Sequence, residues 1–536
     1  MGRRYWLASI NFSGAPGGVL RVATDAVSAT DSAGVGYVFA PGLGPVIYRD
    51  EMPVPGKMGV PPSAVLEILG VDVAALMQDG HTLAFALCEL ALWEEGATWE
   101  QRRVVLVGEC RLPEYGEPDE PVRVSVVATL APPSQRYGFD TSEWPDVPLD
   151  YVITRTTAGQ LPDPSWTVID VNGDTSYLPI VIGYPGHTVG VDGQARQVPG
   201  FQPAQWLASY AYASYGHIGA TDIGIRRKTS PATTSFSVTT TSAATDSSNR
   251  PVTIFDWGAV TPPLWGIVSP NLGNTKGGIL RIEGDVSARD LFDVLRLLHF
   301  LAAVPLDAGA MRAAEPFLRA YLIDTVLEEP VALMDWVSAE LLAMLPLAAV
   351  PGPLGVRYLV HRPDCTAAEA VYTIDVDRNP DVVFVGPVEI DDEVVGSVAL
   401  RYAYDISINQ PTATVTGVGP ADAYTAGTDV VRCADLRTPA APAWTHDSAV
   451  LYARATAALV VAQVAARLGQ PRRMLKYLCP IDAAEHLTLG AIVAIKHAAL
   501  SLSSQPGQVM ALEWSDDGLL GVEMLCYSVP GRSAAG

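Results

Sequence analysis

The sequence is poor in charge and in the patterns that mark enzymes. Charged residues make up 17% of its 536 residues and apolar residues 49%. This balance excludes a disordered or coiled-coil chain, in which charged residues are abundant. No GxSxG, HExxH, Walker loop or GxGxxG after a strand occurs. Glycosidase carboxylate pairs leave no local signature, so these absences disfavour an enzyme without excluding one. The sequence thus predicts no catalytic, cofactor-binding or metal-binding residues.

Disulfide and metal chemistry have equally little support. The six cysteines and eight histidines are scattered, with no CxxC pair and no histidine at metal-ligand spacing. We therefore expect reduced core thiols, and we expect His299, which lies in a leucine-rich stripe, to be a satisfied core residue. The stretches 170–174 and 375–379 are similar to the start of a calcium loop. Both lack the glycine and the glutamate that such a loop needs at its sixth and twelfth positions.

The balance of acidic and basic residues limits which kinds of partner the protein can bind. Thirty-five basic and 58 acidic side chains give a net charge of −23, which disfavours stable wrapping of nucleic acid by a basic surface. The first residues lack the hydrophobic region of a signal peptide, so synthesis in the cytoplasm is expected. The most apolar window, 331–350, contains Asp335 and Glu340 and ends at Pro351. It predicts a buried helix and no stable membrane insertion.

Length and turn content predict several domains. A chain of 56.8 kDa has room for about three to five domains, and 47 glycines with 42 prolines favour short elements. We predict an α+β, mostly β fold: several β-barrel or β-sandwich-like domains, a central helical block and one long C-terminal helix. The expected units are an N-terminal β domain at 1–135, which ends in a proline-rich linker at 132–148; a second β domain at 150–270, with a Ser/Thr-rich exposed loop or edge at 229–248; a mainly helical block at 271–352; and a C-terminal β domain at 353–530 with a helix at 448–468.

Alternating apolar residues and turn dipeptides predict the strands. A strand pair is expected at 104–112 and 122–126, on either side of the acidic stretch 113–120. Further strands are expected at 6–12, 356–360, 371–374, 382–385 and 397–403. Hairpins are expected between 166–169 and 177–182, across Asn172-Gly173, and between 508–514 and 519–527, across Asp517-Gly518. The acidic stretch 113–120 is interpreted as a solvated turn rather than a catalytic carboxylate pair, because no hydrophobic wall is near to raise a carboxyl pKa.

Apolar residues at helical spacing predict three helices. The first begins at Ser287, which caps it, with Asp290 as the partner three residues later. The second spans about 330–345, with Pro330 near its start, and the proline-rich stretch 346–353 ends it. The third, at 448–468, has Asp447 and Ser448 as cap candidates and ends at a glycine and a proline.

Four stretches, taken in order, carry a resemblance to a known family. They are 177–186 (YLPIVIGYPG), the helical block 280–345, the strand 397–404, and a C-terminal module. In that module the Ala-rich helix is followed by 487–495 (LTLGAIVAI), in which Ala491 stands where the family commonly has Asp, and then by a hairpin. Over about two thirds of its length the sequence resembles the baseplate hub, or tail-tip, proteins of long-tailed, siphophage-type bacteriophages and gene-transfer particles.

The resemblance implies a structural, non-enzymatic protein of the virion. Barrel-like domains would pack around the tail axis as a homotrimer that closes the tail tube. The implied partners are the distal tail protein, the tail tube, the tape measure and the tail fibre proteins. DNA would pass through an axial channel without specific binding, since an acidic wall repels it. The virion tail tip is the implied location.

Two alternatives from other functional classes remain open. One is a virion-associated hydrolase that cuts cell-wall glycan or peptide, and the other is a receptor-binding or carbohydrate-binding tail module. Clearing of host cell wall would identify the hydrolase, and binding of the isolated protein to host cells would identify the receptor-binding module.

Overall fold

The computed structural model describes most of residues 3–128 and 290–527, and only short strands between 129 and 289. Inside the two main ranges it leaves out 15–17, 54–58, 60, 71–79, 116–119, 303, 328–332, 353, 392–393, 406–409, 421–428, 437–439, 481–486 and 515–518. The predicted linker at 132–148, the predicted strand at 166–169 and the calcium-like stretch at 170–174 lie outside the described residues. The domain limits stay a prediction.

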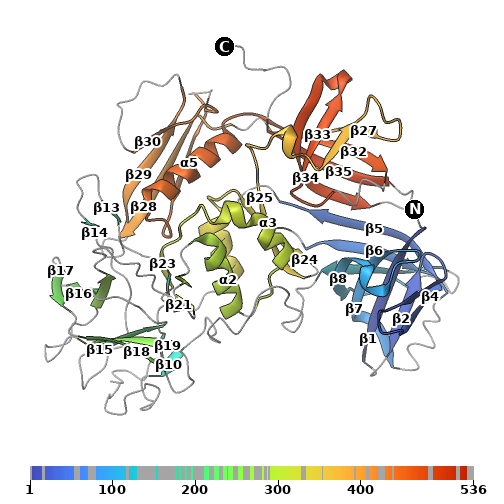
Figure 1. Cartoon of the computed structure of the whole chain (residues 1–536), viewed down its shortest axis with the longest axis horizontal. Coiled ribbons are helices and arrows are strands. Elements are labelled where there is room, and N and C mark those ends of the chain that lie inside the picture. Colours follow the sequence, from blue (N-terminus) through green and yellow to red (C-terminus); the bar gives the residue numbers. More distant parts are fainter. Residues whose placement is uncertain are drawn as a thin grey trace.

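The described chain is mostly β, as predicted, and its strands form several sheets (Figure 1). The largest sheet contains 15 strands drawn from both ends of the chain. Its N-terminal strands are β1 (Arg4–Gly14), β2 (Val19–Ala23), β3 (Val27–Thr30), β4 (Gly36–Pro41), β5 (Leu43–Glu51), β6 (Ser63–Ile68), β7 (His81–Glu94), β8 (Arg103–Cys110) and β9 (Val122–Ala128). Its C-terminal strands are β26 (Tyr372–Asp375), β27 (Val383–Asp391), β32 (Arg472–Pro480), β33 (Ile492–His497), β34 (Leu502–Trp514) and β35 (Leu519–Cys526).

Strand β34 joins the two sets of strands. Its first half pairs with β33, and its last residues pair antiparallel with β5, so that Trp514 lies opposite Tyr48. Trp514 also meets Trp6 of β1 edge-on, with ring centroids 5.8 Å apart. The path of the sheet runs from β27 at one end to β3 at the other, and the described strands form no closed barrel. The prediction of barrel-like domains is therefore wrong for the described strands. To close a barrel of C-terminal strands, the end of β34 would have to pair with another C-terminal strand, but it pairs with β5.

The remaining strands form smaller sheets. A four-stranded sheet has the order β30 (Val430–Arg432), β29 (Gln410–Val418), β28 (Ser397–Asp405) and β31 (Ala443–Asp447). A five-stranded sheet has the order β18 (Thr240–Thr245), β19 (Pro251–Asp256), β15 (Ala211–Tyr215), β12 (Ile180–Ile182) and β23 (Thr325–Leu327), and a three-stranded sheet has the order β17 (Thr233–Ser237), β16 (Ile223–Lys228) and β20 (Gly266–Pro270). Two-stranded pairs are β10 (Val152–Thr154) with β11 (Thr175–Tyr177), β13 (Thr188–Val189) with β14 (Ala195–Arg196), β21 (Arg281–Ile282) with β22 (Val286–Ser287), and β24 (Leu347–Gly352) with β25 (Gly355–Val360). The Ser/Thr-rich stretch 229–248 supplies β17 and β18, which both lie at sheet edges, as the sequence predicted.

The helices are short and lie mainly between residues 291 and 342. They are α2 (Leu291–Leu301), α3 (Ala308–Leu318), α4 (Leu333–Trp336) with the π-helical η4 (Val337–Leu342), and α5 (Arg454–Leu468); single 3₁₀ turns are η1 (Trp99–Gln101), η5 (Ala367–Glu369) and η7 (Ala498–Leu500).

Two predicted helix starts are wrong. Helix α2 begins at Leu291, because the Asp290 carboxylate accepts the backbone N–H of Asp293 at 3.0 Å and caps the helix itself, whereas Ser287 ends strand β22. The C-terminal helix is shorter than the predicted 448–468. It begins at Arg454, since the side chain of Ser448 is buried and accepts the N–H of Val450 at 3.3 Å in the segment before the helix.

Two large hydrophobic cores organise the described chain, beside a smaller one that includes Phe39 and Trp93. The first, the helical core, gathers side chains from α2, α3, η4, α5 and the four-stranded sheet, among them Leu295, Met311, Leu341, Leu400, Val415 and Val461. The second, the sheet core, lies on the large sheet and includes Ile10, Leu66, Val124, Tyr477, Val509 and Met524.

The β24–β25 ribbon contributes to both cores. Its two strands pair antiparallel. Successive side chains along each strand point to opposite faces. Leu347, Ala349 and Tyr358 belong to the helical core, whereas Ala348 and Val350 belong to the sheet core. The ribbon therefore lies between the two parts of the molecule and holds each against the other.

Candidate functional site

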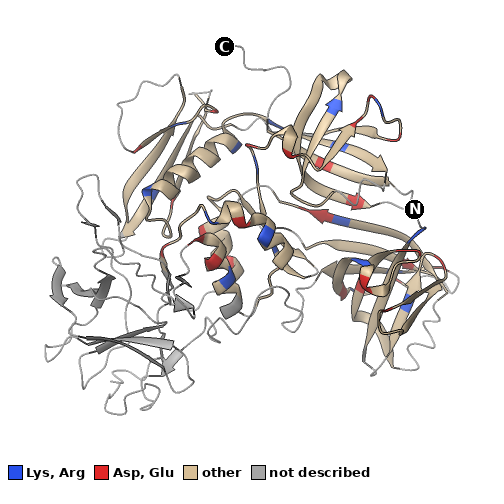
Figure 2. Cartoon of the chain, in the orientation of Figure 1, with Lys and Arg blue, Asp and Glu red and all other residues tan. Residues whose placement is uncertain are grey.

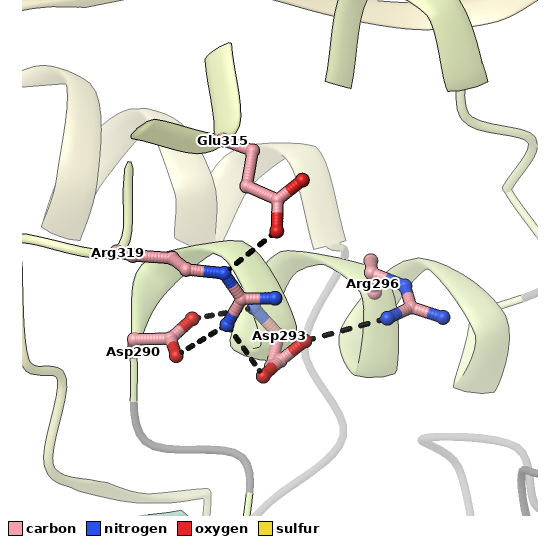
Figure 3. Close-up of polar contacts among 5 residues, drawn as sticks. All are labelled: Asp290, Asp293, Arg296, Glu315 and Arg319. Carbon is pink, nitrogen blue, oxygen red and sulfur yellow. Dashed lines mark hydrogen bonds and ion pairs between the residues drawn. The ribbon is translucent and has the colours of Figure 1, made fainter. Parts of the chain in front are cut away.

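A network of charged side chains links α2 to α3 (Figure 3). One guanidinium nitrogen of Arg319 donates to Asp290 at 2.8 Å and to Asp293 at 3.1 Å, and its Nε donates to Glu315 at 2.8 Å. Arg296 donates to the other oxygen of Asp293 at 3.4 Å. Figure 2 shows that both acidic and basic residues lie on these two helices. Three carboxylates thus meet around two arginines.

The network caps α2 and holds both of its aspartates against Arg319. Burial, with a contribution from the Asp293 charge, raises the pKa of Asp290, while the N–H of Asp293 and Arg319 oppose the shift. A glycosidase needs one protonated and one ionised carboxyl on either side of a substrate bond. Here the Arg319 guanidinium binds both aspartates, so the arrangement caps α2 and ties it to the end of α3.

The candidate metal and redox residues are held in structural contacts. No group of three or more His, Cys, Asp or Glu suited to a metal ion occurs among the described residues. In the stretch 375–379, Asp377 accepts the N–H of Ala498 at 2.9 Å and Asp375 accepts that of Arg378 at 3.2 Å. The cysteines are free, and all but Cys365 are buried, as predicted.

His299 is a satisfied core residue, as predicted. It is 1% exposed, and its ring nitrogens lie 2.7 Å from the hydroxyl of Tyr358 and 3.1 Å from the carbonyl of Val304. Burial lowers its pKa to about 4. The imidazole therefore stays neutral at physiological pH and serves packing.

A buried ion pair joins the N-terminal strands to the ribbon. Arg357 of β25 donates to both oxygens of Asp50 on β5, at 2.7 and 2.8 Å, and to the carbonyl of Pro351 at 3.2 Å. Asp50 is 5% exposed. Burial acts to lower the pKa of Arg357, but the hydrogen bonds and charge of Asp50 outweigh it and the pKa is raised. The ion pair thus links strand β5 to the β24–β25 ribbon.

A second buried cation, Arg467, lies in the last turn of α5 and binds backbone carbonyls there. Arg467 is 4% exposed, and its guanidinium donates to the carbonyls of Met344 at 3.2 Å and Leu345 at 3.4 Å, and to that of Gln463 at 3.4 Å. These carbonyls lie near the C-terminal ends of η4 and α5, where the helix dipole favours a positive charge. Burial lowers the pKa of Arg467 to about 10, so the side chain is charged at neutral pH.

These charged residues had little signal in the sequence. The spacings of Asp293 to Arg296 and of Glu315 to Arg319 are the i,i+3 and i,i+4 steps that bring side chains together on a helix. The partners in the Asp50–Arg357 pair are 307 residues apart, and no local pattern joins them.

Among the helices that the structure describes, none has the length and apolar character of a membrane span.

Comparison with known proteins finds likeness only among solved structures. The sequence matches no model of a known protein family, and no curated protein matches it. The 43 kDa tail protein of prophage MuSo2 from Shewanella oneidensis is 9% identical, with a TM-score of 0.35 over 99% of this chain and 100% of that chain. A tail protein from Neisseria meningitidis MC58 is 8% identical, with a TM-score of 0.34 over 97% of this chain and 96% of that chain.

A third similar structure is a chain from the virion of a native gene transfer agent particle. It is 14% identical, with a TM-score of 0.35 over 67% of this chain and 88% of that chain. These structure neighbours are phage tail proteins and a gene transfer agent component, the classes of particle to which the sequence resemblance points. TM-scores this low do not define a common fold.

Proposed function

We propose that the chain is a structural component of a phage tail tip, a baseplate hub that closes the tail tube and anchors distal tail and fibre proteins. The single observation that carries this proposal is the order of elements along the chain. Within 280–345, α2, α3, α4 and η4 form the helical block; β28 occupies 397–405; and α5 is followed by β33 and the antiparallel pair β34–β35. These are three of the four stretches on which the resemblance rests.

The contacts between the helical core and the sheet core support a role in which the protein transmits mechanical force. One sheet combines strands from both ends of the chain, and the β24–β25 ribbon packs into both cores. Separating the N-terminal strands from the C-terminal ones would break the main-chain pairing between β5 and β34. It would also break the ion pair between Asp50 and Arg357. Continuous, interlocked β structure suits a protein that transmits force more than one that opens around a substrate.

Assembly and channel properties form part of the same proposal. The hub acts as a homotrimer around the tail axis, in contact with the distal tail protein, the tail tube, the tape measure and the tail fibre proteins. The proposal includes an acidic wall of the axial channel that repels the passing DNA, and the net charge of −23 supports it. A trimer would have three times the 56.8 kDa mass of one chain, which light scattering after size exclusion measures directly.

Deletion of the coding sequence from a genome that produces particles tests the proposal. We expect filled heads without functional tails in electron micrographs, and we expect an epitope tag on the complemented protein to label the distal end of the tail. Complete tails in the deletion strain would refute a hub. An inactive point variant of an unrelated virion enzyme serves as the control for particle yield.

Cell-wall zymography separates the hub from a hydrolase. The hub should give no clearing on host cell wall. Clearing that is lost in Asp290→Asn or Asp293→Asn would instead identify the α2–α3 network as catalytic, since these substitutions retain shape and remove charge. Binding of the isolated protein to host cells would favour a receptor-binding module.

A further inference from the structure

Two buried histidines belong to the contacts of the β24–β25 ribbon. His299 of α2 places one ring nitrogen 2.7 Å from the hydroxyl of Tyr358 on β25. His361 follows β25 directly, and its backbone N–H donates to the carbonyl of Pro346, just before β24, at 2.8 Å. Both histidines are 1% exposed. They therefore lie inside the contact between the two large cores, which the ribbon joins.

Neutral groups face the ring of His299. The hydroxyl of Tyr358 lies at one ring nitrogen, and the carbonyl of Val304 lies 3.1 Å from the other. Among the described residues, no charged side chain contributes to the pKa of His299; burial lowers it to about 4, and the Val304 carbonyl opposes the shift. A proton on this ring would thus place an unbalanced charge inside the helical core.

Positive charges face the ring of His361. Arg467 of α5 and Arg472 of β32 both exert their charge on it. Burial, which is the larger cause, and these two charges hold the pKa of His361 well below its ordinary value, and the carbonyl of Pro53 opposes the shift. A proton on this ring would add a further positive charge beside two arginines, at the end of the ribbon.

Acid therefore weakens the contacts of the ribbon on both of its sides. In a detached ribbon both rings would be hydrated, with ordinary pKa values near 6.5. Below about that pH the detached form binds more protons than the packed form, so its population rises as the pH falls. Carboxyl groups with ordinary pKa values near 4 stay ionised down to about pH 5, which leaves histidines as the groups that change charge above it.

We propose that the β24–β25 ribbon is an acid-sensitive latch between the helical core and the sheet core, which opens when His299 and His361 take up protons. The ribbon packs side chains into both cores, so its release loosens the contact between them while each core keeps its own pairing. The two histidines act together because one lies against α2 and the other lies at the end of the ribbon, against α5 and β32.

Hydrogen exchange of the full chain between pH 7.5 and pH 5 tests the latch. Amides of the β24–β25 pairing report its opening, whereas amides of β9 and β28 report the sheet core and the helical core. After correction for the intrinsic pH dependence of exchange, we expect the opening constant of the ribbon to rise by up to about 100-fold per pH unit below about pH 6, as for the uptake of two protons. The opening constants of β9 and β28 should be at least about tenfold smaller at each pH.

Three variants assign the response to these histidines. His299→Gln and His361→Gln each remove one titrating ring, so the rise should fall to about tenfold per pH unit in either. His446→Gln replaces a partly buried histidine on the edge strand β31; it is the matched control and should keep the wild-type rise at the ribbon.

Three results would overturn the proposal. The first is a ribbon opening constant that does not rise between pH 7.5 and pH 5. The second is an opening constant equal to those of β9 and β28, because the whole chain would then unfold at once. The third is a full wild-type rise in both His299→Gln and His361→Gln. If one of these two variants does not fold, the other variant and the wild type decide.

Discussion

Replacing Arg357 by methionine should destabilise the protein strongly, because it leaves Asp50 as an unpaired buried charge. The Asp50 carboxylate is 5% exposed and receives two charge-assisted hydrogen bonds of 2.7 and 2.8 Å. Removing one partner of such a pair costs about 3–5 kcal/mol. Water cannot reach the aspartate well enough to replace the guanidinium, and only the hydrogen bond from the Tyr48 hydroxyl remains, so we expect a loss within this range.

The double variant isolates the cause of the loss. Asp50→Leu combined with Arg357→Met removes both charges and fills the space with apolar atoms, so it should recover most of the stability lost in Arg357→Met alone. An exposed pair provides the control. Arg3 and Asp25 lie 3.3 Å apart with side chains 70% and 47% exposed, and Arg3→Met should cost less than about 1 kcal/mol.

Urea unfolding and hydrogen exchange measure these effects. The free energy of unfolding gives the magnitude, and the exchange of amides in β5 and the β24–β25 ribbon shows whether the loss is at the contact between the two cores. The reasoning is refuted if Arg357→Met stays within about 0.5 kcal/mol of the wild type, or if Arg3→Met is equally damaging.

Three further changes have defined outcomes. Burial lowers the pKa of His299 to about 4 in the folded protein, so below about pH 6.5 the unfolded chain binds more protons than the folded one. The urea concentration at the midpoint of unfolding should therefore fall between pH 7 and pH 4, and it should fall less steeply in His299→Gln. Gly355→Ala, at φ +129 and with a new Cβ 2.6 Å from backbone atoms, should lower the thermal midpoint, whereas Gly36→Ala, with nothing within 4 Å, should not. Ala458→Pro, inside α5, should cost about 3 kcal/mol or more in urea unfolding, and proline at position 454, the first residue of the helix, should cost less; equal losses would contradict the helix bounds.

Local periodicity predicted the strands well. The alternation at 122–126 matches β9, in which Arg123 and Ser125 are exposed between buried valines. The strands predicted around 104–112, 397–403 and 519–527 are present with small shifts in their ends. In β9 one face is buried, so hydrophobic alternation records the environment directly. Strand β35 is buried on both faces, and its continuous apolar run beside a turn dipeptide predicted it instead.

Helix ends and one whole helix were harder to predict. Cap candidates occur close together, as at Ser287 and Asp290, and only the path of the chain decides which one meets the free N–H groups. Helix α3 was not among the predicted helices, and Pro316 lies inside it. A proline there is read as a break, yet Asp307 caps the helix and its buried face packs into the helical core.

Contacts between distant segments could not be predicted from the sequence. Nothing in β5 indicates that β34 is its neighbour, and neither Asp50 nor Arg357 lies in a motif. Such pairs depend on how completed elements dock, which local propensity does not describe. The candidate polar sites, including the α2–α3 network and the residues around Arg467, arise at this level.

The pairing of Tyr48 with Trp514 has a consequence for biosynthesis. The ribosome releases β5 long before it makes β34, so the edge of β5 stays unpaired through most of translation. Such an edge invites pairing with another nascent chain. A transcript cut short of its last codons should therefore yield aggregates rather than a smaller functional protein.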